Sequence, residues 1–198
     1  KKLTEVAPFT VDLLLPSGAE NLNYVLYTDE SPYKMQREWL DRLPFDIYSV
    51  NVHTGAKRLI GRSYRTAPKW SVNGKWAVMY DPIAQVWNKF DGATGKVVNI
   101  SDAIGYPMFM ESYDKPAPAP AYGIAGWTAD GNNVFLYDAY DWWKIDLTGE
   151  RQPECLTKGY GRKHGKSIRK MTSNIDKDVF QKDEKVIVLS LIHISEPT

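Results

Sequence analysis

Short apolar runs separated by polar turns recur along the chain and predict β-strands. Residues 76–80 (WAVMY) and 133–137 (NVFLY) are nearly continuous apolar runs, which is typical of strands covered on both faces. Residues 48–52 (YSVNV) and 143–147 (WKIDL) instead alternate between apolar and polar side chains, which is typical of half-buried strands. The mixture predicts sheets in which central strands lie beside more exposed edges.

One phrase occurs twice with the same layout. WSVNGKWAVMYD, residues 70–81, is repeated as WTADGNNVFLYD, residues 127–138, with a shift of 57 positions and with Trp, Gly, Tyr and Asp at matching places. The Asn-Gly and Asp-Gly pairs within the phrase tolerate the positive φ angles that tight hairpin turns need. A period of this size indicates a repeat architecture.

A second recurring phrase ends in Thr-Gly. Its copies are DIYSVNVHTG (46–55), QVWNKFDGATG (85–95) and DWWKIDLTG (141–149), and the last copy lacks one residue of the turn. Together the two phrases describe a four-stranded antiparallel meander, which cannot bury both of its faces unless neighbouring meanders stack on it. We therefore predict an all-β fold, a partial β-propeller of about three four-stranded antiparallel blades plus the start of a fourth. A β-sandwich is the alternative.

The repeat spacing divides the chain into successive blades of an incomplete propeller domain, residues 1–188. The predicted blades are, in order, residues 8–65, 66–121, 122–168 and, for the start of the next, 171–188. The segment LSLIHISEPT (189–198) resembles translated read-through of a sequencing-library adapter. We expect a non-native tail there and leave it out of fold reasoning.

Two insertions interrupt the blades. The first is YKMQREWLDRLP (33–44), in which Met35, Trp39 and Leu43 recur at i, i+4 and i+8. This spacing predicts one short amphipathic helix that ends at the following proline. The second is GYPMFMESYDKPAPAPAYGIAG (105–126), whose Pro-Ala run favours extended backbone and predicts a loop at a rim or an interface.

Composition excludes some partners. The 198 residues include 25 Lys and Arg and 24 Asp and Glu, a net charge of +1, so no overall field favours nucleic acid or an anionic membrane. No run of about 18 apolar residues occurs, so we expect no membrane span. The single cysteine, Cys155, excludes an internal disulfide, and we interpret it as a small buried hydrophobe rather than a nucleophile.

One segment comes close to a phosphate-binding loop. GYGRKHGKS (159–167) ends in Gly-Lys-Ser, but the position that must be Gly is Tyr160, since Gly161 lies one residue too close. The segment also lies between β repeats rather than between a strand and a helix. We interpret it as a polar crossing between blades with a solvated basic patch. The patch consists of Arg162, Lys163, Lys166, Arg169 and Lys170.

No metal, cofactor or catalytic residue is predicted. The histidines, His53, His164 and His193, are far apart in sequence, which disfavours a zinc site, and the last lies in the suspected tail with Ser195. The sequence contains no Gly-x-Ser-x-Gly phrase, so it holds no serine-hydrolase nucleophile elbow.

The phrase YDAYDWWKID contains carboxylates that could serve acid–base chemistry. They are Asp138, Asp141 and Asp146. All of them are expected at strand ends and turns, where Asp commonly accepts hydrogen bonds from backbone amides. We favour this structural role over the catalytic one.

The aromatic residues of the repeat and of the second insertion carry different expectations. Trp70 and Trp127 stand at matching places in the repeat and are expected to fill the space between adjacent blades. For the insertion, contact with a neighbouring domain and packing within the loop are both open. The insertion aromatics are Tyr106, Phe109, Tyr113 and Tyr122.

The repeated phrases resemble a known family. WSVNGKWAVMYD, the Asp-Ile-Tyr and Asp-Trp-Trp strands, and above all YGIAGWTADGNNVFLYDAYDWWKIDLTG (122–149) followed by LTKGYGRKH (156–164) are similar to propeller domains of bacterial prolyl oligopeptidase-family serine peptidases. The resemblance covers most of residues 46–169. The Trp-turn phrase alone is shared by many propellers, including periplasmic proteins of the Tol system. The chain departs where the commoner phrase has Pro-Asp, with Val-Asn in one copy and Ala-Asp in the other.

The resemblance implies the N-terminal, substrate-gating propeller of a serine peptidase that hydrolyses peptides. In that family the propeller caps an α/β-hydrolase domain that carries the catalytic Ser, Asp and His, and it admits only short or unfolded peptides. The implied partners are a peptide substrate and the C-terminal α/β-hydrolase domain of the same parent chain, with no nucleic acid and no cofactor. None of the catalytic positions can be carried over, so we expect a truncated fragment that is catalytically silent alone, from a periplasmic or secreted parent. The alternatives are a non-catalytic β-propeller binding protein and, with less support, a propeller hydrolase such as a glycosidase.

Overall fold

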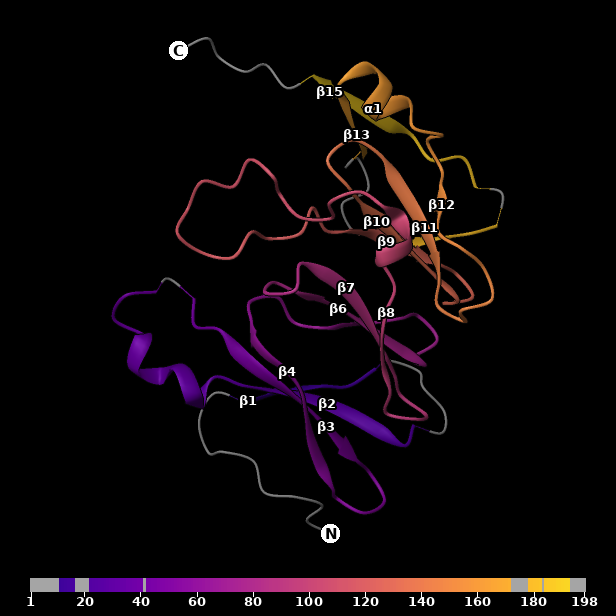
Figure 1. Ribbon diagram of the computed structural model, residues 1–198. Helices are drawn as coiled ribbons and strands as arrows, with labels where there is room; N and C mark the ends of the chain where they lie inside the picture. The colour runs from indigo at the N-terminus through magenta and orange to yellow at the C-terminus, as the bar shows by residue number, and fades with distance from the viewer. Residues whose placement is uncertain (1–10, 17–21, 41, 172–177, 183, 193–198) are drawn as a thin grey trace. The chain divides into compact units, whose positions relative to one another are not determined.

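The computed structural model describes residues 11–16, 22–40, 42–171, 178–182 and 184–192 (Figure 1). The chain divides into two compact units, Lys1–Asn99 and Ile100–Thr198, and the described part of each is mostly β-sheet. Four-stranded antiparallel meanders recur in sequence order, so the fold is a partial β-propeller, as the alternation and the repeat predict.

The first unit contains two antiparallel sheets, with strand orders β1-β2-β3-β4 and β5-β6-β7-β8. Each strand pairs with the next one along the chain, so both sheets are simple meanders. The strands are β1 (Val11–Leu14), β2 (Tyr24–Asp29), β3 (Phe45–Asn51), β4 (Lys57–Tyr64), β5 (Lys69–Trp70), β6 (Trp76–Asp81), β7 (Val86–Asp91) and β8 (Val97–Asn99).

The two sheets of this unit pack against each other through one apolar cluster. Leu26 and Ile47 come from the first sheet, and their side chains are fully buried. Ala77, Met79 and Phe90 come from the second sheet and are at most 1% exposed. Because burial of a large apolar side chain is worth roughly 1.5–3 kcal/mol, this cluster is the main attraction between the two sheets.

Hydrogen bonds at the margin of the cluster fix how the sheets meet. The Gly92 carbonyl accepts bonds from the backbone N–H groups of Asn23 and Tyr24, at 3.2 and 3.1 Å. The Trp70 indole donates to the Leu14 carbonyl at 2.9 Å. Each bond joins one sheet to the other, so the spacing between the sheets is set by directional contacts as well as by packing.

The second unit contains a third meander and an added strand. The meander consists of β9 (Ile124–Thr128), β10 (Asn133–Tyr137), β11 (Trp142–Asp146) and β12 (Glu154–Cys155). A fifth strand, β14 (Val179–Phe180), pairs with β9 in parallel, which gives the order β12-β11-β10-β9-β14. The sequence did not predict this parallel strand.

Gly126 permits the close approach of β14 to β9. Its φ is +154°, and a Cβ at this position would lie 2.6 Å from the Asp178 carbonyl oxygen and 2.5 Å from the Phe180 ring. The register between β9 and β10 also shifts at this point. Glycine is therefore required here by both backbone conformation and space.

The rest of the second unit consists of short elements. They are the 3₁₀ helix η2 (Asp102–Ile104), the helix α1 (Tyr160–His164), and the antiparallel strands β13 (Lys166–Lys170) and β15 (Val188–Ile192), which pair with each other. β13 ends where we expected the next blade to begin, and β15 extends into the segment that we set aside as a tail. The blade boundaries and the assignment of the tail stay predictions.

The two copies of the Trp phrase share one register and one turn geometry. Trp70 pairs with Ala77 across β5 and β6, and Trp127 pairs with Val134 across β9 and β10. In both turns the glycine N–H donates to the carbonyl of the preceding Ser or Thr at 2.8 Å. The Asn or Asp side chain between them accepts a bond from the N–H two residues later, at 3.1 and 2.9 Å. The sequence repeat therefore marks structurally equivalent strands.

The Thr-Gly turns also share their chemistry. Asn51 and Asp91 each accept bonds at Oδ1 from the N–H groups two and three residues later, at 2.8–3.3 Å. In the shorter third copy, Asp146 accepts from the N–H groups of Thr148, Glu150 and Arg151 at 2.9–3.1 Å. One polar side chain closes each turn, as expected for Asx turns.

The prediction of an amphipathic helix in residues 33–44 is wrong. The segment instead begins with a 3₁₀ helix, η1 (Ser31–Gln36), and continues as turns. Met35 and Trp39 are 82% and 68% exposed, and only Leu43 is buried. A 3₁₀ helix repeats every three residues, so residues four apart do not share a face.

Candidate functional site

Asp138 and Asp141 lie in the turn between β10 and β11, with 0% and 1% of their surface exposed. Asp138 Oδ1 accepts hydrogen bonds from the N–H groups of Tyr140 and Asp141, both at 2.6 Å. Its Oδ2 accepts from the Trp143 indole and from the Arg162 guanidinium, both at 2.9 Å. Each oxygen of this buried carboxylate therefore accepts two hydrogen bonds.

Asp141 joins the same turn to α1. Its Oδ1 accepts from the Thr157 hydroxyl at 2.6 Å and from the Gly161 N–H at 2.9 Å. Its Oδ2 accepts from the Arg162 N–H at 3.1 Å. The two amides belong to the first turn of α1 and have no partner within the helix. The carboxylate supplies that partner and holds α1 against the meander.

Gly161 explains why the sequence nearly matches a phosphate-binding loop. A Cβ at this position would lie 2.5 Å from the Tyr140 carbonyl oxygen and 2.7 Å from that of Lys166. In a phosphate-binding loop, backbone amides donate to the phosphate. Here the amides of Gly161 and Arg162 donate to the Asp141 carboxylate instead. The glycine therefore serves close packing, and nothing in this segment favours nucleotide binding.

Two members of the basic patch are drawn into the structure rather than solvated. The Arg162 guanidinium, bonded to Asp138, lies 3.8 Å from the centroid of the Tyr106 ring. The Arg169 guanidinium donates to the Asp138 carbonyl at 2.9 Å and lies 4.6 Å from the Tyr137 ring. Burial lowers the pKa of the Arg169 guanidinium from its usual value. Both arginines are half-buried, and the Arg162 side chain keeps 30% of its surface exposed, so the solvated-patch interpretation holds only in part for them.

We call Asp138, Asp141, Arg162 and Arg169 the buried ion cluster. It contains one ion pair, Arg162 with Asp138, while Arg169 donates to backbone carbonyls of the same turn. Each carboxylate oxygen of Asp138 and Asp141 has a donor. A general acid or base must reach the proton that it transfers, and these oxygens are enclosed. The cluster therefore has a structural role, as favoured from the sequence, and Asp146 has the same role in its turn.

The insertion aromatics pack on the meander that follows them. The Tyr106 ring lies 6.0 Å from the Trp143 ring, and the Tyr122 ring lies 5.6 Å from the Arg169 guanidinium. Phe109 forms a β-bridge across the loop. The bridge at Phe109 is packing within the loop, whereas Tyr106 and Tyr122 contact the meander of the same unit, which neither open interpretation named.

Trp70 and Trp127 occupy equivalent strand positions, as described above. Trp70 packs against the apolar cluster of the first unit, with its ring 6.2 Å from the Phe90 ring, and so lies between two sheets as predicted. Trp127 is 5% exposed. Its place between blades stays a prediction.

The remaining candidate residues are scattered. Cys155 is half-buried, and its sulfur accepts a backbone N–H at 3.3 Å. His53 Nε2 lies 3.1 Å from an Asn side-chain oxygen, and the His164 ring packs against a tyrosine ring at a tilt of 40°, with centroids 4.4 Å apart. Tyr113 is half-buried, and His193 lies outside the described residues.

Within the described ranges, no group of three or more His, Cys, Asp or Glu could hold a metal ion. No helix in the part of the chain that the structure describes is long and apolar enough to span a membrane.

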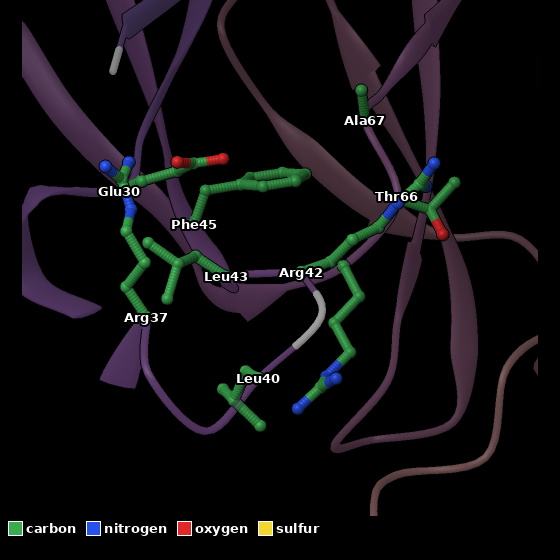
Figure 2. Close-up of a pocket in the computed structure, with 9 residues that line it drawn as sticks. Glu30, Arg37, Leu40, Arg42, Leu43, Phe45, Thr66 and Ala67 are labelled. Carbon is green, nitrogen blue, oxygen red and sulfur yellow. The ribbon is translucent and has the colours of Figure 1, made fainter. Parts of the chain in front are cut away.

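An open cavity of about 480 Å³ lies beside η1 in the first unit (Figure 2). Its walls come from the end of β2, the turns that follow η1, the start of β3 and the segment after β4. It is lined by Glu30, Arg37, Leu40, Arg42, Leu43, Phe45, Arg65, Thr66 and Ala67. A cavity of this volume falls within the usual range for small-molecule sites.

Sequence reasoning missed this cavity. The segment after η1 is rich in charge, but it was interpreted as a helix. Arg65 joins the cavity because β4 pairs with β3, with Tyr64 opposite Phe45. β3 and β4 are consecutive strands, but their register shifts at two places near Phe45 and Ile47, and the sequence does not reveal these shifts. The only available signal was the excess of arginine in the first insertion and at the end of β4.

No protein-family model matches the chain, and no curated protein matches it. Among solved structures it is similar to a chain in the complex of KlAtg21 with the coiled-coil of AgAtg16, at 10% identity and a TM-score of 0.41 over 92% of this chain and 50% of that one. It is similar to the β-propeller domain of the Trilobed protease from Pyrococcus furiosus, at 17% identity and a TM-score of 0.36. That match covers 73% of this chain and 42% of the other. It is also similar to the Pyrococcus horikoshii acylaminoacyl peptidase, at 14% identity and a TM-score of 0.35. That match covers 73% of this chain and 25% of the other. The chain thus spans half or less of each of these proteins, and the likenesses are too distant to assign a function.

Proposed function

We propose that the chain is part of the β-propeller domain of a prolyl oligopeptidase-like serine peptidase, in which the propeller gates an α/β-hydrolase domain of the same parent chain. The observation that carries this proposal is the resemblance of residues 122–164 to that family. The similar solved structures include the β-propeller domain of a protease and an acylaminoacyl peptidase.

The structure supports the proposal by showing what the resembling stretch does. Asp138, Asp141 and Arg162 lie within it, and each needs the others as hydrogen-bond partners. The stretch therefore works as one structural unit that ties a meander to the segment after it. A resemblance over a whole interdependent unit is more specific than a resemblance over one hairpin turn.

The contribution of this chain to catalysis would be geometric. In the parent, an activated serine would attack the peptide carbonyl and form an acyl-enzyme, which water then hydrolyses. The propeller would exclude folded proteins from that serine by restricting the path through which a substrate reaches it. The carboxylates of the buried ion cluster are enclosed and are assigned no part in the chemistry.

The test uses the intact gene and its product. We expect the codons after position 188 to encode a Gly-x-Ser-x-Gly phrase followed by an Asp and a His. A fluorophosphonate probe should label the full-length protein, and replacement of that serine by alanine should abolish labelling. The full-length protein should cleave short peptides and leave folded proteins intact. A stop codon directly after the last blade, or absence of labelling, would refute the proposal.

The second candidate is a propeller that binds a ligand without catalysis. The open, arginine-lined cavity of Figure 2 favours it, because a binding protein needs a recessed site with polar groups in its walls. The same full-length protein separates the two candidates: ligand binding without probe labelling supports the binding protein.

A further inference from the structure

We propose that the cavity beside η1 is a binding site for a small organic carboxylate that carries an apolar group. The proposal does not depend on the peptidase function, since it concerns only residues of the first unit. It rests on the charge of the cavity, on its apolar surface and on the way its walls are fixed.

The charge of the lining favours an anion. Arg37, Arg42 and Arg65 contribute three guanidinium groups, whereas Glu30 contributes one carboxylate. The whole chain has a net charge of only +1, so this excess is local. The planar guanidinium fork matches a carboxylate with two parallel hydrogen bonds, which makes arginine well suited to this class of ligand.

The apolar part of the lining favours a ligand that is more than a bare anion. Leu40, Leu43 and Phe45 belong to the same cavity, and Figure 2 shows their side chains between those of Arg37 and Arg42. An inorganic phosphate would leave this surface in contact with water. The Glu30 carboxylate also opposes a dianion more strongly than a monoanion. A carboxylate with an aromatic or aliphatic group satisfies both features.

A buried carboxylate fixes the walls relative to each other. Asp46 is 7% exposed, and its Oδ1 accepts from the Tyr33 hydroxyl at 2.6 Å and from the Ser63 N–H at 3.1 Å. Tyr33 belongs to η1, which precedes Arg37, and Ser63 belongs to β4, which precedes Arg65. The backbone segments that lead to the arginines on the two walls therefore share one anchor, which limits the entropy that these segments lose when a ligand binds.

The test measures binding of N-acetyl-phenylalanine to the full chain by isothermal titration calorimetry or ligand-observed NMR at low ionic strength. We expect a dissociation constant of about 1 mM or below, and at least about tenfold weaker binding of N-acetyl-phenylalaninamide, which lacks the charge. A tripeptide that ends in phenylalanine, with a free or an amidated C-terminus, distinguishes a peptide end from a free small acid. Binding should weaken as salt is raised.

Matched variants assign the binding to this cavity. Arg37→Gln and Arg65→Gln should each weaken binding about fivefold, the effect expected for a partly solvated charge pair. Arg62→Gln removes an exposed arginine of β4 that is not in the lining, and it should leave binding unchanged. Glu30→Gln should strengthen binding about threefold, because it removes the opposing charge.

Three results would overturn the proposal: equal binding of the acid and the amide, equal weakening by Arg62→Gln and Arg65→Gln, or tighter binding of inorganic phosphate than of the organic acid. Thermal melts of each variant show whether it is folded. If Arg65→Gln fails to fold, the exposed Arg37 variant decides the outcome alone.

Discussion

Replacing Asp138 by asparagine tests the buried ion cluster with almost no change in shape. The side chain is fully buried, and its two oxygens face two donors each. An asparagine has one oxygen and one NH₂ group. Whichever way the amide is turned, its NH₂ group meets two N–H donors: the backbone amides of Tyr140 and Asp141, or the Trp143 indole and the Arg162 guanidinium.

The expected loss follows from that count of donors. Each buried donor left without an acceptor costs about 1–3 kcal/mol, and a charged one costs more. The Arg162 side chain is 30% exposed, so water offsets part of its loss. We therefore expect Asp138→Asn to lower the free energy of unfolding by about 3–5 kcal/mol. Domains are typically stable by only about 5–15 kcal/mol, so this is a large fraction of the total.

The assay is urea denaturation of the full chain followed by tryptophan fluorescence, because Trp143 lies against the altered carboxylate. Amide hydrogen exchange at Tyr140 and Asp141 reports the local effect. The control is Asp130→Asn, since the first copy of the repeat has Asn73 at the equivalent turn position, where its Oδ1 accepts the Lys75 N–H at 3.1 Å. The control should change stability by less than about 0.5 kcal/mol.

A difference of less than about 1 kcal/mol between Asp138→Asn and the unaltered chain would refute the reasoning. It would mean that the four donors find other acceptors, most simply water, and that the cluster is not enclosed. An equal effect of the control would show that loss of any turn carboxylate, and not burial, causes the change.

Three further perturbations follow from single contacts. Gly126→Val should displace β14 and expose the β9 edge, seen as faster exchange of the β9 amides; unchanged protection would contradict the packing argument. Gly161→Ala should separate α1 from the Asp141 carboxylate and lower the unfolding free energy by about 2–4 kcal/mol, measured by urea denaturation; a loss near zero would show that the helix shifts freely. The Thr128 hydroxyl lowers the pKa of the Asp130 carboxyl below its usual 3.8. The ionised Asp130 carboxylate therefore stabilises the fold above about pH 4, and this stabilisation is lost as the pH falls through the lowered pKa. Thr128→Val should raise this pKa in a carbon-13 NMR titration, and an unmoved titration would show that the hydroxyl is not the cause.

Local patterns predicted the fold class because the turns of the repeat close on themselves. Asp81 and Asp138 each accept bonds from the amides two and three residues later, so equivalent sequence produces an equivalent bend. The parallel strand β14 was missed because its partner lies far away in sequence and its approach depends on Gly126. The helix after β2 was predicted wrongly because spacing alone does not distinguish an α-helix from a 3₁₀ helix followed by turns.

For the sites too, features set within one turn could be predicted, whereas features that depend on residues far away in sequence could not. The structural role of Asp138 follows from its own turn, but its ion partner, Arg162, is 24 residues away. The inward direction of Arg162 and Arg169 depends on α1 being folded back onto the turn, which no local pattern indicates. The cavity beside η1 depends in addition on the register of β3 and β4, so its arginines gave no combined signal in the sequence.

The strand β14 has a consequence for self-association. It occupies the free edge of β9, and it leaves the five-stranded sheet bounded by two strands, β14 and β12, that are only two residues long. Edges this short give a second molecule little backbone on which to extend the sheet. Extension of the sheet beyond β9 would first require β14 to detach, and Gly126 permits the close approach that keeps β14 in place.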